Sequence, residues 1–178
     1  MPPCCTVLQC AGRGERNEPH RSKNDALRKL STFYWVPLYT YNQPYGRCLM
    51  GLLQDQSVMA GMGNYLCCEA LHVAGIHPQH RPADLSAAQL RQLTGSCLHL
   101  IRQSHETGGI TNDLERATIL RKQGASFEAS RFHVYRRAGL PCYHCGTDII
   151  KGRFCDRMGY LCPTCQRRSG TGGDIRHD

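Results

Sequence analysis

Four cysteines near the C-terminus have the spacing of a metal site. Cys142 and Cys145 form one Cys-x-x-Cys pair, and Cys162 and Cys165 form a second, with sixteen residues between the pairs. Each pair can present two thiolates, and the intervening residues suffice for a short β-hairpin whose base gathers the four sulfurs into a tetrahedron. The spacing therefore predicts one structural Zn²⁺ bound by these four cysteines.

Two other roles for the same cysteines are a pair of disulfides and a redox Cys-x-x-Cys. Disulfides require an oxidising compartment, and residues 1–30 contain no apolar segment behind a basic start that would act as a secretory signal. A redox motif would use one pair and leave the other idle. Zinc is therefore favoured, and we expect a protein that is not secreted, cytoplasmic in a bacterium or nuclear in a eukaryote.

The positive charge of the chain is concentrated at the cysteine-rich end. The formal net charge is +8 for 178 residues, and residues 131–168 contribute +6, from eight Lys or Arg and two Asp. Residues 51–130 hold six Lys or Arg and seven Asp or Glu, a net charge of −1. A basic region favours a polyanion, because Lys and Arg that neutralise phosphates release condensed counterions. Nucleic acid is the expected partner, and no apolar run is long enough to predict a membrane span.

Several other histidine and cysteine residues could be considered as metal ligands. His144 lies inside the first cysteine pair, but adjacent residues rarely aim at one metal, so we expect it to be exposed or to contact DNA. Cys155 lies between the pairs and is interpreted as a spare thiol, the residue most able to replace a ligand. Cys67, Cys68 and Cys97 fall in expected helices and are interpreted as small buried hydrophobic residues.

The segment before the metal site has the pattern of a helix, a glycine turn and a second helix. Apolar residues recur on one helical face from Leu49 onward, and a glycine-rich break follows at residues 60–64. Asn64 is a good N-cap and begins a second helix that is expected to reach Gly75.

A third helix is expected from a capping box that begins at Ser86, with apolar residues recurring at intervals of three and four as far as Ile101. Residues 107–130 begin with glycines and predict a flexible loop with one short helix near residues 114–122. Residues 131–136 alternate between polar and apolar, which predicts a strand leading into the hairpin.

These elements predict a mainly α fold followed by a small β-hairpin zinc finger. The expected divisions, in chain order, are an irregular N-terminal segment 1–46, a helical domain 47–130, the zinc-finger hairpin 131–168 and a flexible tail 169–178.

The sequence resembles the C-terminal half of the formamidopyrimidine-DNA glycosylase and endonuclease VIII family of base-excision-repair enzymes, closest to its endonuclease VIII-like branch. The resemblance covers about residues 47–166, and its segments occur in the family's order. They are Leu53-Gln-Asp-Gln-Ser-Val-Met-Ala-Gly-Met-Gly63-Asn64-Tyr65, Glu69-Ala-Leu71, Gly75-Ile-His-Pro78, Arg131-Phe-His-Val-Tyr135, Gly139-Leu-Pro-Cys142 and Cys162-Pro-Thr-Cys165-Gln166. The resemblance implies a helix-two-turns-helix domain, a zinc finger, and a monomer that binds damaged or abasic double-stranded DNA.

The resemblance also implies DNA contacts for individual residues. Asn64, preceded by Gly63, is expected to contact phosphate beside the lesion, where the N–H groups at a helix start favour an anion. Arg157 is expected to grip the DNA backbone from the minor-groove side. An ordinary helix cap at Asn64 and a solvated hairpin tip at Arg157 are the alternatives. Weaker, general phosphate attraction is expected from Arg136, Arg137, Lys151 and Arg153.

The family's catalytic motif is matched at one position. Family catalysis uses an N-terminal Pro, freed by removal of Met, whose amine attacks the sugar C1′, and a Glu that follows it directly. Here Pro2 follows Met1, but Pro3 occupies the Glu position. Residues 1–46 also do not match a β-rich catalytic lobe of at least ~100 residues. We therefore expect a damaged-DNA-binding portion of a DNA glycosylase and abasic-site (AP) lyase that lacks the catalytic lobe.

Two alternatives stay open at this point. The chain is a functional minimal AP lyase with Pro2 as its nucleophile, or it is a zinc-ribbon module whose basic face binds an acidic protein.

Overall fold

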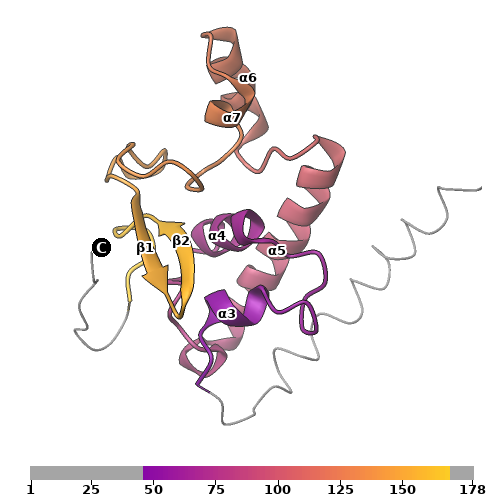
Figure 1. The fold of residues 1–178 in the computed structure, drawn as a ribbon, viewed down its shortest axis with the longest axis vertical. Helices are drawn as coiled ribbons and strands as arrows, with labels where there is room; N and C mark the ends of the chain where they lie inside the picture. Colours follow the sequence, from indigo (N-terminus) through magenta and orange to yellow (C-terminus); the bar gives the residue numbers. More distant parts are fainter. Residues whose placement is uncertain (1–45, 169–178) are drawn as a thin grey trace, which may run out of the picture. The chain divides into compact units, whose positions relative to one another are not determined.

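A computed structural model describes residues 46–168, in which helices precede one short β-hairpin (Figure 1). The described part is mainly helical with a two-stranded antiparallel hairpin, as the sequence predicts. None of its helices is both long and apolar enough to cross a bilayer. The expected irregular segment and flexible tail fall outside the described residues, apart from Gly46. The elements are α3 (Leu49–Leu53), α4 (Asn64–Val73), the 3-10 helix η1 (Pro82–Asp84), α5 (Ala87–Glu106), α6 (Leu114–Lys122), α7 (Phe127–Ser130), β1 (Ile150–Phe154) and β2 (Arg157–Leu161).

Helix α3 is short and almost completely buried. Leu49 and Leu53 have no exposed surface, and Met50 is 1% exposed. The Leu49 N–H donates to the His80 carbonyl (2.7 Å), and the Met50 N–H donates to the Pro78 carbonyl (3.1 Å). The segment after α4 thus supplies acceptors for N–H groups that a helix start leaves unpaired.

Gln56 holds together the segment that connects α3 to α4. Its Nε2 donates to the Met62 carbonyl (3.1 Å), and its Oε1 accepts from the Gly61 N–H (2.9 Å). Gly61 has φ +85°, a left-handed conformation that favours glycine. Helix α4 begins at Asn64, and its N-cap is Gly63. Asn64 is therefore the first helical residue rather than the expected N-cap.

Helix α5 begins at the predicted capping box. The Ser86 Oγ accepts from the Gln89 N–H (3.2 Å), and the Gln89 Oε1 accepts from the Ser86 N–H (2.9 Å). The helix extends past Ile101 to Glu106, and the Gly109 N–H then donates to the Ser104 carbonyl (2.7 Å). Helix α5 packs against α4 through its predicted apolar face. The buried residues of that face include Leu90, Leu93, Cys97 and Leu100.

The region between α5 and the hairpin contains more helix than the sequence predicts. The short helix near residues 114–122 is confirmed as α6, whose N-cap Asp113 accepts from the Arg116 N–H (2.8 Å). Helix α7 is a further single turn that begins after the N-cap Ser126, whose hydroxyl accepts from the Ala129 N–H (3.2 Å).

Residues 131–136 do not form the predicted strand. The backbone runs through bends and turns, because the N–H groups of His133, Val134 and Tyr135 donate to the Glu69 carboxylate rather than to a neighbouring strand. The sequence alternation does correspond to alternating burial. It reflects packing against α4 instead of sheet pairing.

The hairpin of β1 and β2 closes through a two-residue turn. Phe154 lies opposite Arg157, with Cys155 and Asp156 between them. Both turn residues have positive φ, 48° and 66°, as two-residue hairpin turns require. Strand β2 packs against α4, and Figure 1 shows the hairpin beside α3 and α4.

Candidate metal centre and nucleic-acid interface

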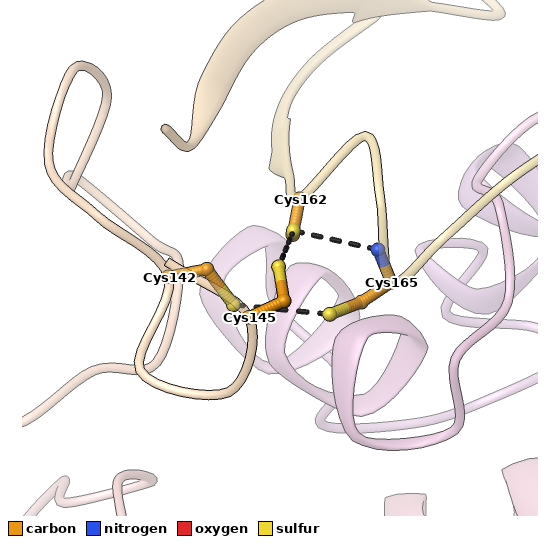
Figure 2. A group of neighbouring side chains, drawn as sticks. All are labelled: Cys142, Cys145, Cys162 and Cys165. Carbon is orange, nitrogen blue, oxygen red and sulfur yellow. Dashed lines mark hydrogen bonds between the residues drawn. The ribbon is translucent and has the colours of Figure 1, made fainter. Parts of the chain in front are cut away.

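The four cysteines of the two Cys-x-x-Cys pairs converge on one point (Figure 2). Their sulfurs all lie within 4.8 Å of one another. The Sγ atoms of Cys142 and Cys165 are 3.9 Å apart, and those of Cys145 and Cys162 are 3.3 Å apart. Four thiolates placed tetrahedrally at the usual Zn–S distance of about 2.3 Å would be separated by about 3.8 Å. The cluster has the ligands and the spacing to hold one metal ion.

Local backbone hydrogen bonds build each half of the cluster. The Gly146 N–H donates to the Cys142 carbonyl (2.9 Å), with Gly146 at φ +76°, and the Gln166 N–H donates to the Cys162 carbonyl (2.9 Å). The His144 N–H points at the Cys142 sulfur (3.4 Å). An N–H group that points at a sulfur favours the thiolate, which is the form of cysteine that binds metals.

His144 and Cys155 both stay outside the converging group. The His144 Nδ1 lies 3.6 Å from the Cys165 sulfur, but this side chain is not one of the residues that meet at the common point. Cys155 is not the spare thiol that the sequence predicted, because it forms a disulfide with Cys48. The hairpin turn reaches the start of α3, which spacing along the chain could not show.

The remaining described cysteines are packing residues, as predicted. Cys67, Cys68 and Cys97 are 0%, 2% and 1% exposed. Burial raises the pKa of the Cys68 and Cys97 thiols to about 12, so both stay protonated at neutral pH.

Glu69 is a completely buried carboxylate that fixes α4 to the segment leading into the cysteine cluster. Its Oε1 accepts from the Val134 and Tyr135 N–H groups at 2.8 and 2.9 Å. Its Oε2 accepts from the Thr111 hydroxyl and the His133 N–H, both at 2.8 Å. These donors offset the cost of burying the charge. No sequence pattern points to this role of Glu69, because its partners lie more than forty residues away.

Gln166 makes a second connection, after the last cysteine. Its side chain is 1% exposed. The Nε2 donates to the Ile76 carbonyl (2.9 Å), and the Oε1 accepts from the Cys162 N–H (3.0 Å) and lies 3.2 Å from the His72 Nδ1. The second half of the cluster is therefore tied to the C-terminal end of α4.

Asn64 and Gly63 lie at the start of α4. Asn64 is half-buried, and its Oδ1 accepts from the Gln54 Nε2 at 3.0 Å. Within residues 46–168, nothing pairs with the Asn64 Nδ2 amide. Gly63 is exposed at φ −85°, and a Cβ there would meet no atom within 4 Å. The fold itself therefore does not require glycine at this position.

Arg157 is exposed at the first position of β2, directly after the hairpin turn. In the part of the chain that the structure describes, it has neither an ion-pair nor a hydrogen-bond partner beyond its strand pairing. Lys151 and Arg153 are exposed on the paired strand β1. Arg136 is exposed but lies 3.5 Å from the Glu128 carboxylate. Three hairpin cations are therefore available to an anion, and Arg136 is partly engaged.

Arg137 is not the exposed phosphate contact that the sequence predicted. It is 5% exposed, its Nη2 donates to the Pro141 carbonyl at 2.9 Å, and its Nη1 donates to the His133 carbonyl. Its guanidinium lies 3.5 Å from the centroid of the Tyr143 ring. Arg137 therefore braces the backbone that precedes the first cysteine pair.

A cavity of about 380 Å³ lies between the C-terminal end of α4 and the first cysteine pair. Burial, followed by the nearby Arg116 charge, lowers the pKa of His133 to about 4. Burial also lowers the pKa of His72. These imidazoles are neutral at pH 7, and no sequence motif marks either of them as a site residue. The lining includes His72, His133, His144, Tyr143 and Arg116.

Comparison with protein families gives one match. Residues 31–115 match the family described as "Formamidopyrimidine-DNA glycosylase H2TH domain". The matched range contains α3, α4 and α5.

Curated relatives are bacterial proteins named Endonuclease 8. The chain is 41% identical over 120 residues to that of Escherichia coli O17:K52:H18 (strain UMN026 / ExPEC), which covers 67% of this chain and 42% of the relative. It is 40% identical over 121 residues to that of Salmonella arizonae, covering 68% of this chain and 43% of the relative. The chain thus spans less than half the length of these relatives.

Solved structures with a similar fold are DNA complexes. One is Lactococcus lactis FPG (MutM) with a FAPY-dG containing DNA, with a TM-score of 0.63 and 21% identity, covering 83% of this chain and 55% of that one. Another is MutM with a carbocyclic 8-oxo-G containing DNA, with a TM-score of 0.58 and 23% identity, covering 78% and 47%. At these identities the likeness shows the fold.

Proposed function

Since this chain belongs, by its H2TH domain, to the formamidopyrimidine-DNA glycosylase and endonuclease VIII family, we propose that it supplies the damaged-DNA-binding portion of a base-excision-repair DNA glycosylase and AP lyase. In this proposal residues 47–130 form a helix-two-turns-helix domain and residues 131–168 a zinc-finger hairpin. The observation that carries the proposal is that α4, which begins at Asn64, packs against β2, which begins at Arg157.

The two proposed contact residues suit phosphate for different reasons. The first turn of α4 has unpaired N–H groups and the positive end of the helix dipole, and Asn64 adds a free amide donor. Arg157 adds a planar cation with no other partner in the described part of the chain. The open space around Gly63 lets a DNA backbone approach the helix start closely. Two packed elements can thus engage one duplex.

Zn²⁺ is the proposed metal of the cysteine cluster. Four thiolates fit its preferred tetrahedral geometry and leave no open position for a water or substrate. The ion would therefore supply folding free energy to the hairpin rather than chemistry. The ligands would be Cys142, Cys145, Cys162 and Cys165.

General attraction to DNA comes from the other exposed cations of the hairpin region. Lys151 and Arg153 lie on β1, and Arg136 precedes the first cysteine pair. Such charges act on any phosphate backbone and carry no sequence information. We expect a monomer that binds double-stranded DNA with damaged or abasic sites, in the bacterial cytoplasm or the nucleus of a eukaryote, with no membrane partner.

A second candidate function is a minimal AP lyase that uses Pro2. The observation in its favour is that Pro2 directly follows Met1, so removal of Met would expose a secondary amine. Pro2 lies outside the described residues. No residue in 46–168 is proposed as a catalytic group.

The deciding experiment measures binding and trapping together. The zinc-loaded chain is titrated by fluorescence anisotropy against matched duplexes with and without a tetrahydrofuran abasic analogue, at several salt concentrations. Borohydride trapping on a duplex with a true abasic site runs in parallel. We expect salt-dependent binding that favours the abasic analogue, without a covalent adduct. An adduct that Pro2→Gly abolishes would establish the lyase, and absence of binding at low salt would favour the protein-interaction module.

Arg157→Ala tests the hairpin contact. We expect about tenfold weaker binding on every DNA sequence and a salt slope smaller by about one, because one phosphate contact is lost. Arg91→Ala is the matched control, since it removes the same charge from the exposed surface of α5. Equal effects of the two variants would show that only net charge matters.

Asn64→Ala tests the helix start. The loss of affinity should be larger on the abasic duplex than on the intact one, because the proposed contact lies beside the lesion. Anisotropy on both duplexes measures the ratio of the two losses. A ratio of one would assign Asn64 to the fold rather than to lesion recognition.

A further inference from the structure

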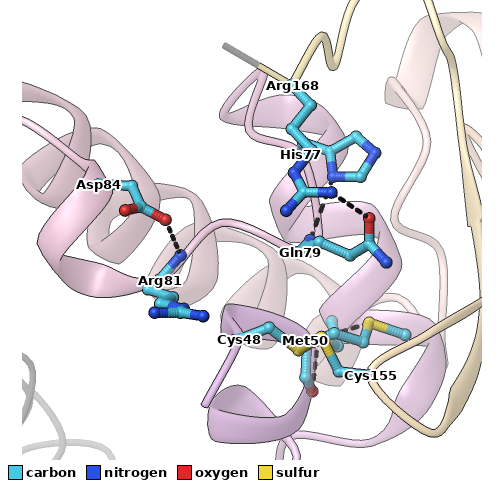
Figure 3. The surroundings of a disulfide bond; sticks show 9 residues. Cys48, Met50, His77, Gln79, Arg81, Asp84, Cys155 and Arg168 are labelled. Carbon is cyan, nitrogen blue, oxygen red and sulfur yellow. Dashed lines mark hydrogen bonds between the residues drawn. A yellow bond between two sulfur atoms is a disulfide. The ribbon is translucent and has the colours of Figure 1, made fainter. Parts of the chain in front are cut away.

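A disulfide links the tip of the hairpin to the helical domain (Figure 3). Cys155 in the hairpin turn is bonded to Cys48, with Cα atoms 6.4 Å apart and a sequence separation of 107. Cys48 is the N-cap of α3 and is 3% exposed, whereas Cys155 is exposed. The bond thus joins two segments that the metal cluster does not connect directly.

The side chains around the bond hold the hairpin closely against α3. Met50 lies beside the disulfide in Figure 3. A Cβ at Gly159 would lie only 2.8 Å from the Met50 Cε, so the Met50 side chain of α3 packs directly on β2. Packing therefore fixes the hairpin as far as the buried Phe154, and the covalent bond fixes the exposed turn residue Cys155 to Cys48.

The turn has an unfavourable backbone conformation. Cys155 and Asp156 both have left-handed φ, which costs free energy for residues other than glycine. No side-chain hydrogen bond of Asp156 is present within the described range. The Phe154–Arg157 strand pair closes this turn, and the disulfide is the further restraint that holds it on α3.

Arg157 follows this turn directly and has no partner of its own in residues 46–168. If the tip is unrestrained, binding phosphate through Arg157 costs the conformational entropy of ordering both the turn and the side chain. If the tip is already bonded to α3, the entropy of the turn has been lost before binding, so binding costs less. The state of the disulfide should therefore change the affinity that Arg157 contributes.

We propose that Cys48 and Cys155 form a redox-modification site that sets the affinity of the hairpin for DNA phosphate. The proposal rests on the proposed DNA-binding function. In the oxidised chain the tip is held on α3 and Arg157 is preorganised. In the reduced chain the tip is free and binding is weaker.

Glutathione disulfide is the class of oxidant that completes the step. The exposed Cys155 thiolate attacks one sulfur of glutathione disulfide, which forms a mixed disulfide and releases one glutathione thiolate. The Cys48 thiolate then attacks the Cys155 sulfur and releases the second glutathione. The two cysteines are oxidised with loss of their two thiol protons, and glutathione disulfide is reduced to two glutathiones.

The other described cysteines are poorly placed for this exchange. Cys67, Cys68 and Cys97 are buried with raised pKa values. The remaining four converge on the metal position. Among the described residues, Cys48 and Cys155 are thus the pair that can respond without emptying the cluster.

The test uses the zinc-loaded full chain, equilibrated in glutathione buffers from fully reduced to fully oxidised. Alkylation and mass spectrometry give the fraction bonded between Cys48 and Cys155, and a metal assay gives the bound zinc. Anisotropy gives the affinity for the duplex with the tetrahydrofuran analogue. We expect the oxidised form to bind about three- to tenfold more tightly, from the ordering cost of a tip and one long side chain. The change should follow the bonded fraction while zinc stays constant.

Variants separate the proposed site from other redox effects. Cys155→Ser should bind like the reduced chain in every buffer. Because Cys155 is exposed, the variant is expected to fold. Cys97→Ser, the matched control, should keep the response. A response that survives in Cys155→Ser, failure of the bond to form, or equal affinity of the two mapped forms would each overturn the inference. If neither form binds DNA, the proposed function fails as well, which distinguishes the two outcomes.

Discussion

The helical part of the molecule, residues 46–130, and the hairpin part, residues 131–168, are stabilised in different ways. The helical part has a continuous core whose members include Leu49, Leu53, Leu71, Leu93 and Leu100. The hairpin part is shorter than forty residues, and a region of that size rarely buries enough apolar surface to fold alone. It depends on the cysteine cluster, on polar anchors to α4 and on the disulfide to Cys48. Packing therefore positions Asn64, whereas the cysteine cluster, buried hydrogen bonds and the disulfide position Arg157.

Removing one cysteine ligand should separate the two parts most strongly. Cys142→Ser should abolish stoichiometric zinc binding and the amide protection of residues 131–168, because structural zinc contributes folding free energy directly. Protection in α5 should persist. Metal analysis and hydrogen exchange measure both effects. Cys97→Ala, a change in the helical core, should retain zinc, and a Cys142→Ser protein with one bound zinc would break the comparison.

Glu69→Ala should have the next largest effect. The change leaves three backbone N–H groups and one hydroxyl without their buried acceptor, which should lower the free energy of unfolding by about 3–5 kcal/mol. Urea denaturation measures this. Glu128→Ala is the control, because that exposed carboxylate makes only surface ion pairs and should cost less than about 1 kcal/mol. Similar costs for the two variants would refute the anchoring role of Glu69.

Acidification should weaken the junction between the two parts by a smaller amount. Burial lowers the pKa of His133 from 6.5 to about 4, so between these pH values the unfolded chain binds a proton that the folded chain does not. The stability that this group contributes is complete above pH 6.5 and is lost as the pH falls toward 4, on the order of 3 kcal/mol for a shift of this size. Urea denaturation at several pH values measures the slope. His133→Gln should reduce the slope of stability against pH. If the slope came from protonation of cysteine thiolates instead, the variant and the unmodified protein would have the same slope.

Elements defined by local residues could be predicted from sequence. The α5 start follows from the capping box of Ser86 and Gln89, and the cysteine cluster follows from the spacing of its two pairs. Helix α6 has its own cap and the predicted bounds. In each case the interacting residues are near neighbours or carry a distinctive repeated spacing.

Features that depend on distant partners could not be predicted in this way. The expected strand at residues 131–136 failed because Glu69, more than sixty positions earlier, takes its N–H groups. Arg137 is a residue type that usually lies on the surface, but here its side chain is buried against the Pro141 carbonyl and the Tyr143 ring. Cys155 was assigned to no partner because Cys48 is 107 positions away.

The bond between Cys48 and Cys155 also changes the topology of the chain. When it is closed, residues 48–155 form a covalent ring that contains α3 to α7 and the first cysteine pair. In the chain-entropy description, closing a ring of this size lowers the conformational entropy of the unfolded state, which stabilises the fold by about 5 kcal/mol. A single protease cut inside the ring leaves the two pieces of the chain covalently joined through the disulfide. They become separate fragments only when the disulfide is reduced.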